Sequence, residues 1–212
     1  MPMLDDKVIK ELKESFKGLQ SDVVIKYFTQ EMECQFCKET KELLQELEKN
    51  SASIKLEIFD FVKDKSEAQK YGIDKIPATV VMGDTDRGIR FYGIPAGYEF
   101  GTLVEAIKMV SNGKADLSQE SKTFLDGLKK DIHLQVFVTP TCPYCAGAVV
   151  LAHQMAFYSD RVKADMVEAT EFPHLSQKYQ VMGVPKTVIN EKTFQEGAAP
   201  ENVIIEKIKS VL

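Results

Sequence analysis

The chain has 212 residues, of which 44% are hydrophobic and 28% are charged. These proportions are typical of a globular protein with a buried core and exclude a largely disordered chain. The formal net charge of −5 gives no electrostatic basis for binding nucleic acid or an anionic membrane, so neither is expected as a partner. The chain turns acidic at Asp5 and Asp6, where a signal peptide would be apolar, and contains no run of about 18 apolar residues. We therefore expect a cytoplasmic protein.

Apolar periodicity in the first half of the chain predicts an alternation of helices and strands. The predicted elements are, in order, a helix over 6–16, a strand over 22–28, a helix after Cys37 over 38–49, a strand over 54–61, a short helix ending near 71, a strand over 79–82, a further strand, and a helix over 100–110. The polar segment 111–116, which contains an Asn-Gly pair, then interrupts the helical pattern.

The second half repeats this order. Its predicted elements are a helix over 118–129, a strand over 131–137, a helix over 146–157, a strand over 162–167, a short helix ending near 179, a strand over 187–189, a further strand, and a helix over 200–211. This order predicts an α/β protein of two tandem domains, 1–115 and 116–212. Each domain is expected to have a central mixed sheet flanked by helices.

All four cysteines fall in two Cys-x-x-Cys motifs, at Cys34 and Cys37 and at Cys142 and Cys145. Each motif lies between a predicted strand and a predicted helix, where the first amide groups and the helix dipole stabilise a thiolate. The second cysteine follows about one turn later, close enough to resolve a mixed disulfide. We therefore predict that Cys34 and Cys142 attack the substrate and that Cys37 and Cys145 resolve the intermediate.

The residues between the cysteines differ in the two motifs. Pro143 suits the first helical turn, where a backbone N–H is not needed, and it stiffens the second motif. The first motif has Gln35 and Phe36 instead. The two sites are therefore expected to differ in redox poise, and the pair formed by Cys34 and Cys37 could have a purely structural role.

A proline follows each motif at the same distance, 43 residues after the first cysteine, as Ile76-Pro77 and Val184-Pro185. In both places a β-branched residue precedes the proline and a strand follows it. Only about 5–6% of X-Pro bonds are cis, but two at equal distance from two motifs predict a cis bond in each. Such a bond would turn the backbone of Ile76 and Val184 toward the sulfurs, where it can pair with an extended substrate.

Two acidic residues occupy equivalent positions at the end of the second strand of each half, Asp60 and Glu168. A carboxylate there that faces the motif would accept the proton of the resolving cysteine. The pattern fits a solvent-exposed residue at the end of a strand equally well. Four cysteines can also ligate zinc, but residues 38–141 separate the two pairs, far more than in structural zinc sites. We expect no metal and no bound cofactor.

On these residues the chain resembles thioredoxin-fold proteins, and specifically the glutaredoxin-like protein disulfide oxidoreductases of thermophilic archaea and bacteria. The resemblance covers essentially the whole chain. It is carried by VTPTCPYC at 138–145, DMVEA at 165–169, FYGIPAG at 91–97, and the two prolines. It implies two thioredoxin-like units, four redox-active cysteines and cis bonds at Pro77 and Pro185. The amino-terminal part of the flavoprotein that reduces alkyl hydroperoxide peroxidase has a related architecture but keeps only its second pair, so two intact pairs argue against it.

Three functions follow from this sequence. The first is a cytosolic dithiol–disulfide oxidoreductase that reduces, forms or rearranges protein disulfides and is recharged by an NADPH-dependent flavoprotein, similar to thioredoxin reductase, or by a small thiol. The second is a dedicated electron carrier to a peroxidase, with a peroxiredoxin as partner. The third is a chaperone or scaffold that holds unfolded chains beside Pro77 and Pro185 without turnover. We expect the first.

Overall fold

The computed structural model describes residues 3–212; Met1 and Pro2, with which the predicted first domain begins, lie outside the described residues. The elements of the first half are α1 (Asp6–Phe16), β1 (Val23–Thr29), α2 (Cys37–Lys49), β2 (Ile54–Asp60), α3 (Lys65–Lys70), β3 (Ala78–Met82), β4 (Ile89–Tyr92) and α4 (Tyr98–Asn112). Those of the second half are α5 (Gln119–Asp126), β5 (Ile132–Val138), α6 (Cys145–Tyr158), β6 (Val162–Glu168), α7 (Pro173–Lys178), β7 (Lys186–Ile189), β8 (Thr193–Glu196) and α8 (Glu201–Lys209). The predicted order of elements is confirmed.

Local sequence explains where several helices begin and end. The Asp5 side chain accepts a hydrogen bond from the Val8 amide at 2.8 Å and caps α1, as Ser118 caps α5 through the Ser121 amide at 3.2 Å. Gly113, with φ of 64°, ends α4 in the left-handed conformation that glycine adopts without steric cost.

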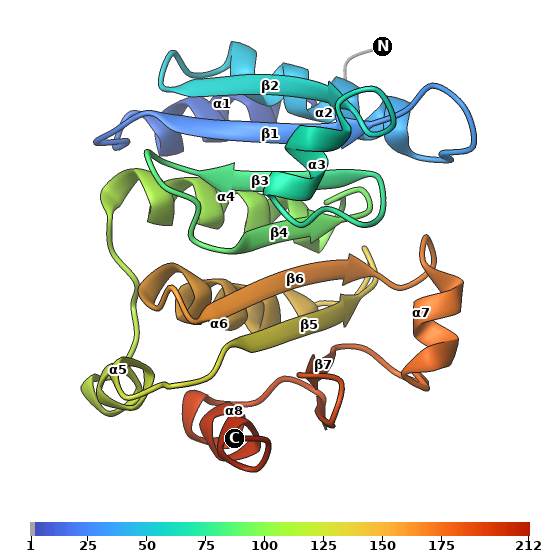
Figure 1. The fold of residues 1–212 in the computed structure, drawn as a ribbon. Helices are drawn as coiled ribbons and strands as arrows, with labels where there is room; N and C mark the ends of the chain where they lie inside the picture. Colours follow the sequence, from blue (N-terminus) through green and yellow to red (C-terminus); the bar gives the residue numbers. More distant parts are fainter. Residues whose placement is uncertain (1–2) are drawn as a thin grey trace.

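The strands form one continuous sheet in the order β2-β1-β3-β4-β6-β5-β7-β8 (Figure 1). In each half a central strand, β1 or β5, pairs parallel with β2 or β6 and antiparallel with β3 or β7. The halves join where β4 pairs parallel with β6, from Ile89 opposite Ala164 to Tyr92 opposite Val167. The sequence predicted a sheet for each half, and this pairing merges the two because it satisfies the backbone groups of two strand edges.

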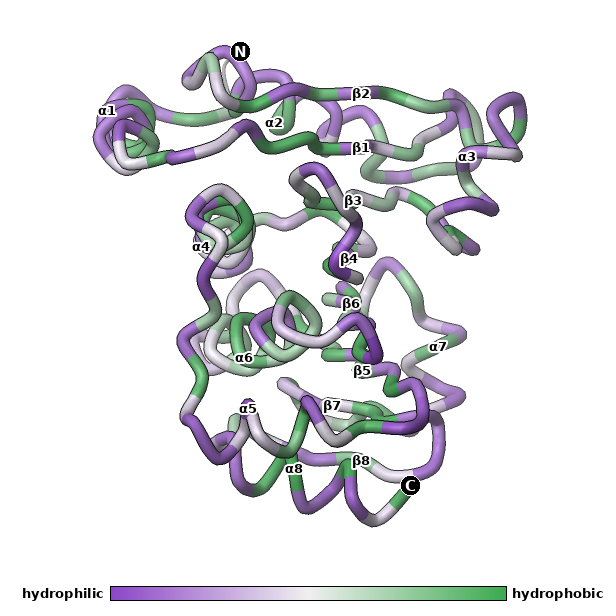
Figure 2. The backbone as a smooth tube through the Cα atoms, turned by 60° about the vertical axis from the view of Figure 1, so that its left-hand side comes forward, coloured by the Kyte–Doolittle hydropathy of each residue, from purple (hydrophilic) through white to green (hydrophobic). Residues whose placement is uncertain are grey.

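The helices cover the two faces of this sheet unequally (Figure 2). The larger core lies on the side of α4 and α6 and includes Tyr27, Leu44, Phe91 and Met155. A smaller core lies on the side of α3 and α7. The loops that carry the cysteines leave the carboxyl ends of β1 and β5, at the same edge of the sheet.

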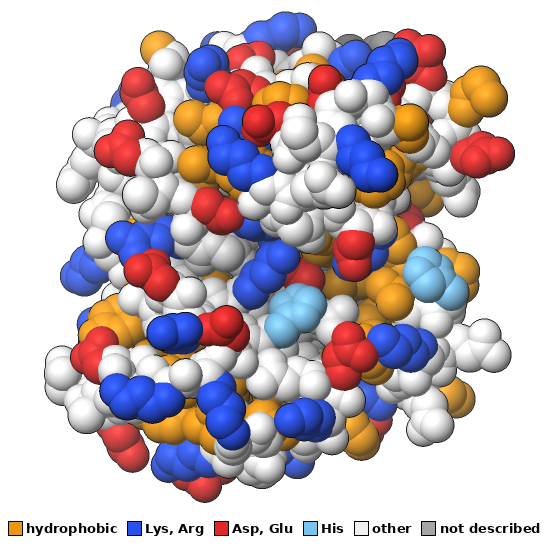
Figure 3. Space-filling view, in the orientation of Figure 1, with side chains coloured by type: hydrophobic (Ala, Val, Ile, Leu, Met, Phe, Trp, Pro, Cys, Tyr) orange, Lys and Arg blue, Asp and Glu red, His pale blue; other side chains and the backbone are white. Residues whose placement is uncertain are grey.

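The segment between α4 and α5 contains the predicted boundary, and it packs against the protein through the buried side chains of Ala115 and Leu117. Figure 3 shows Lys and Arg interspersed with Asp and Glu over one face, with hydrophobic side chains exposed between them. Within residues 3–212, none of the helices has the length and apolar character needed to cross a bilayer.

Candidate redox site

The first cysteine pair forms a disulfide between Cys34, in the loop after β1, and Cys37, the first residue of α2. The Cα atoms lie 5.5 Å apart. Cys34 is half-buried, whereas Cys37 is only 2% exposed. The hydroxyl of Tyr27, on β1, donates a hydrogen bond to the Cys37 carbonyl oxygen at 2.7 Å. This contact fixes the start of α2 against the central strand.

The second pair has the same arrangement, with Cys142 in the loop after β5 and Cys145 at the start of α6. Both side chains are buried, at 8% and 0% exposure. Because α6 begins at Cys145, Pro143 lies in the turn before the helix, not in its first turn as predicted. In both pairs the predicted attacking cysteine is the more exposed of the two, as an attacking thiolate requires.

The predicted cis bonds are confirmed for Ile76-Pro77 and Val184-Pro185. The carbonyl of Pro77 accepts from the Gly93 amide at 2.9 Å, and that of Pro185 from the Gly197 amide at 2.8 Å. These hydrogen bonds fix each proline at the position just before β3 or β7, and Ile76 and Val184 precede the prolines directly.

At the second site the proline segment lies directly against the sulfur. The carbonyl oxygen of Val184 is 3.7 Å from the Cys142 Sγ. The two residues before this carbonyl are exposed, and Met182 is 91% exposed. Tyr144, between the cysteines, is 72% exposed. Exposed side chains, Tyr144 and Met182, thus belong to the two segments that contain Cys142 and Val184.

The two acidic residues predicted as proton acceptors have different environments. Asp60 accepts hydrogen bonds from the amides of Val62 and Lys63, at 3.0 and 2.8 Å, and these bonds hold its pKa below the ordinary value. Glu168 is 2% exposed; its Oε2 accepts from the Thr170 amide and hydroxyl and from the Glu171 amide. The role of each as a proton acceptor stays a prediction.

Sequence reasoning missed the buried Glu99 and the partly buried Glu171. Glu99 is 1% exposed and accepts from the Thr102 hydroxyl at 3.0 Å; burial raises its pKa to about 7. Glu171, which follows β6, also has its pKa raised to about 7 by burial. Glu99 lies on the same face of α4 as the buried Leu103 and Ala106. A charged residue at helical spacing from apolar residues was therefore the sequence signal that could have revealed its burial.

The first half of the chain contacts the second cysteine loop through the start of α4. The Tyr98 amide donates to the Pro140 carbonyl at 3.1 Å, and a Cβ atom on Gly97 would lie 2.2 Å from that oxygen. Gly97 has φ of 60°, which also favours glycine. The two halves therefore meet at the loop that leads to Cys142.

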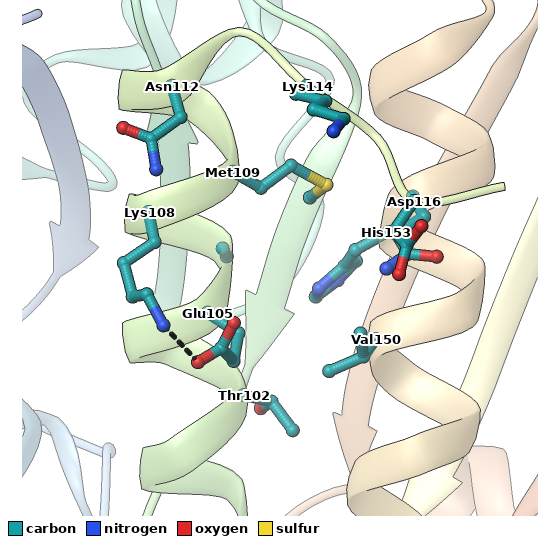
Figure 4. Close-up of a pocket in the computed structure, with 11 residues that line it drawn as sticks. Thr102, Glu105, Lys108, Met109, Asn112, Lys114, Asp116, Val150 and His153 are labelled. Atoms are coloured by element: carbon teal, nitrogen blue, oxygen red, sulfur yellow. Dashed lines mark hydrogen bonds and ion pairs between the residues drawn. The ribbon is translucent and has the colours of Figure 1, made fainter. Parts of the chain in front are cut away.

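Two cavities lie away from the disulfides. One of about 260 Å³ lies between α4 and α6, where Figure 4 shows His153 between the helices and Lys108 paired with Glu105. The buried His153 ring contacts the Arg90 carbonyl through Nε2 at 3.2 Å, and burial lowers its pKa to about 4. The other, of about 590 Å³, lies at the amino ends of β5 and β6. Neither is lined by a cysteine.

Comparison with known proteins agrees with this architecture. The model of the thioredoxin domain family matches residues 132–210. A protein disulfide oxidoreductase from Aeropyrum pernix has 29% sequence identity and a TM-score of 0.92, covering 99% of this chain and 94% of that one. The NTD_N/C domain of an alkylhydroperoxide reductase from Enterococcus faecalis has 26% identity and a TM-score of 0.89, covering 97% and 99%.

Among curated proteins, the F component of an alkyl hydroperoxide reductase from Staphylococcus aureus is 29% identical over 177 residues, 82% of this chain. The chain spans only 32–38% of the length of the first curated relatives it matches. The two intact cysteine pairs argue against this reductase architecture, yet the chain is similar to it as well as to the archaeal oxidoreductase.

Proposed function

We propose that this chain, which consists of two thioredoxin-like units in tandem, is a dithiol–disulfide oxidoreductase that reduces, forms or rearranges disulfides in other proteins. The observation that carries the proposal is a repeated geometry. In each half a disulfide-bonded cysteine pair lies at the amino end of a long helix, and a cis-proline precedes the third strand; at the second site that segment lies against Cys142. The division into units 1–115 and 116–212 and the cytoplasmic location belong to the same proposal.

The reaction begins from the reduced pair. The thiolate of Cys142 attacks one sulfur of a substrate disulfide, forms a mixed disulfide with it, and expels the other substrate sulfur as a thiolate. Cys145 then loses its proton and attacks the Cys142 sulfur. The Cys142–Cys145 disulfide forms, the mixed disulfide breaks, and the second substrate thiol leaves with the proton. Cys34 and Cys37 perform the same steps in the first unit, and both reactions run in reverse when substrate thiols are oxidised.

The helix and the cis-proline segment each contribute to this chemistry. The amino end of α6 stabilises the Cys142 thiolate through its amide groups and its dipole. An extended substrate would pair with the backbone of Val184, whose carbonyl already lies against Cys142, while Tyr144 and Met182 offer apolar contact. Ile76 occupies the corresponding position in the first unit. Because apolar contact carries little sequence information, this site suits many protein substrates.

The oxidised pairs need a reductant. We propose an NADPH-dependent flavoprotein, similar to thioredoxin reductase, or a small thiol. The similarity to the F component of the alkyl hydroperoxide reductase also favours a second candidate, a dedicated electron carrier to a peroxidase of the peroxiredoxin class. A dedicated carrier would reduce one such partner at least about 100 times faster than a model protein disulfide.

The test is the rate at which the reduced protein cleaves a model protein disulfide, measured for wild type, Cys34→Ser and Cys142→Ser. We expect Cys142→Ser to remove most of the activity. If both single variants are inactive, the units relay electrons to each other. If neither variant changes the rate, the oxidoreductase proposal is wrong. In that case, full binding of unfolded chains by a variant without cysteines would favour the scaffold function.

A further inference from the structure

Two glutamate side chains of the second half of the chain lie against the backbone that follows β4 in the first half. Glu39 lies on α2, two residues after Cys37. Glu168 ends β6, and Glu171 follows it. The parallel pairing of β4 with β6 brings the end of β6 to the edge at which the cysteine loops lie. The sheet junction therefore places two glutamates of the second unit against Gly93, whose amide donates to the carbonyl of the cis-proline Pro77 at 2.9 Å.

The backbone of the first unit encloses the Glu171 carboxyl group. Its Oε1 accepts a hydrogen bond from the Ile94 amide at 2.6 Å. A Cβ atom on Gly93 would lie 2.8 Å from this oxygen and 2.6 Å from the Glu168 Cβ. Glycine at this position, with φ of 92°, is what allows the backbone of the first unit to approach both glutamates so closely. The Glu171 carboxyl group is thus held by the backbone of the first unit.

Tyr27 connects this cluster to the cysteines. Its hydroxyl donates to the Cys37 carbonyl at 2.7 Å, and the charges of Glu171 and Glu39 add to burial in raising its pKa. The Tyr27 hydroxyl thus contacts the first residue of the helix that carries Glu39. Within residues 3–212, the Oε2 of Glu39 and the Oε1 of Glu168 are buried without a hydrogen-bond partner. A buried carboxyl oxygen without a partner has a free hydrogen-bonding position.

The surroundings of Glu171 oppose its ionisation. Burial raises its pKa to about 7, and the charges of Glu168, at the end of β6, and Glu39, on α2, act in the same direction. The hydrogen bond from the Ile94 amide, after β4, acts against them. Tyr27, on β1, is neutral near pH 7. A carboxyl group of this kind changes its protonation state in response to a negative charge formed nearby.

We propose that Glu171, assisted by Glu39, takes up and returns a proton as the Cys34–Cys37 pair changes its redox state, so that the second unit supplies an acid–base group to the first site. This inference rests on the proposed function and names a positioning residue for its first site. When the disulfide is reduced by an external dithiol, the S–S bond breaks and two electrons enter the pair. Cys37 becomes a thiol, Cys34 a thiolate, and Glu171 binds the second proton near the new negative charge.

The experiment uses the full chain with Cys142→Ser and Cys145→Ser, so that only the first pair exchanges electrons. The fraction of reduced pair is measured in dithiothreitol redox buffers at pH 5.5 and pH 8 by thiol trapping. At pH 8 the ionised Glu171 opposes formation of the Cys34 thiolate. We therefore expect Glu171→Gln to shift the equilibrium about tenfold toward the dithiol at pH 8, which corresponds to one pKa unit of coupling, and to have little effect at pH 5.5.

Two further variants sharpen the test. Glu171→Asp should retain part of the pH dependence, and Glu39→Gln should shift the equilibrium in the same direction by a smaller factor. The matched control is Glu171→Gln in a chain with Cys34→Ser and Cys37→Ser, where the second pair should keep its equilibrium at both pH values. That control also reports whether the variant folds.

An equal shift at both pH values, or an equal shift in both pairs, would overturn the inference. Because trapping measures an equilibrium and not turnover, a failure of the inference can be told apart from a failure of the proposed function. If the first pair cleaves no protein disulfide but shows the expected shift, it is the proposed function of that pair that fails, and not the coupling between Glu171 and the pair.

Discussion

The two cysteine loops are equivalent in sequence but differ in how the protein encloses them. Four residues, Gln30 to Glu33, separate β1 from Cys34, and three of them are exposed. Three residues separate β5 from Cys142, and the first unit packs on them through Gly97 and Tyr98. Glu33, the last residue of the longer loop, has φ of 58°, which is uncommon for a residue other than glycine.

The way in which the units are joined explains this difference. The second unit continues the sheet of the first, so that β6 extends β4 and β2 remains an outer strand. The start of α4 therefore covers the second cysteine loop, whereas no equivalent helix of the described chain precedes the first loop. A tandem repeat joined in one direction necessarily gives its two copies different neighbours. Equal motifs then become unequal sites.

The largest effect should appear in the reactivity of the four thiols. After reduction, iodoacetamide should alkylate Cys34 and Cys142 at least about 100 times faster than Cys37 and Cys145, because the latter are less exposed than their partners and lack the helix-stabilised thiolate. Mass spectrometry of a time course measures this. Cys34 should react several times faster than Cys142 because its loop is more exposed. Equal rates within a pair would refute the assignment of attacker and resolver.

The contact between the units should break when Gly97 is replaced. Gly97→Ala places a Cβ atom 2.2 Å from the Pro140 carbonyl and strains a positive φ, so we expect the free energy of unfolding to fall by about 2 to 3 kcal/mol. Urea denaturation measures this. Gly101→Ala is the matched control on α4, because nothing lies within 4 Å of its Cβ position, and it should stabilise by up to about 1 kcal/mol. Equal stability of the two variants would show that the contact is unimportant.

The buried Glu99 should make stability depend on pH. Burial raises the pKa of Glu99 to about 7 in the folded protein. The contribution of the protonated group to the free energy of unfolding is therefore fully present below about pH 4.5 and is lost as pH rises through 7. Glu99→Gln removes the ionisable group. Between pH 5 and pH 8 this variant should therefore lose about 2 kcal/mol less stability than wild type. Denaturation at several pH values measures the difference, and parallel profiles would contradict it.

The smallest effect concerns a contact found only in the first unit. Tyr27→Phe removes the hydrogen bond to the Cys37 carbonyl and should lower the free energy of unfolding by about 1 kcal/mol. Urea denaturation measures this change as well. The rate of alkylation of Cys142 should stay the same, since the second unit has Val136 at the equivalent position. If the variant changes the alkylation rate of Cys142 as much as that of Cys34, the two sites are coupled through Tyr27.

Much of the fold could be predicted because its signals are local. The alternation of apolar residues located the strands, and the spacing of leucines located α2, within a few residues of the observed ends. The two cis bonds were predicted from a repeated distance and not from chemistry at Pro77 alone. The single sheet could not be predicted, since nothing in the sequence of β4 or β6 indicates which strand it pairs with. Glu171 was missed for the same reason, because Gly93 and Ile94 enclose it from the other half.

The sequence by itself determined the number of units, the order of their elements, the two cysteine pairs and the prolines that accompany them. These properties depend on periodicity and spacing, which each half carries complete. The tertiary structure decided how unequal the sites are: which loop is covered by α4, which carboxyl groups are buried, and which of them lie near Tyr27. Burial and electrostatic environment depend on neighbours that are distant in sequence, and only the pairing of β4 with β6 brings those neighbours together.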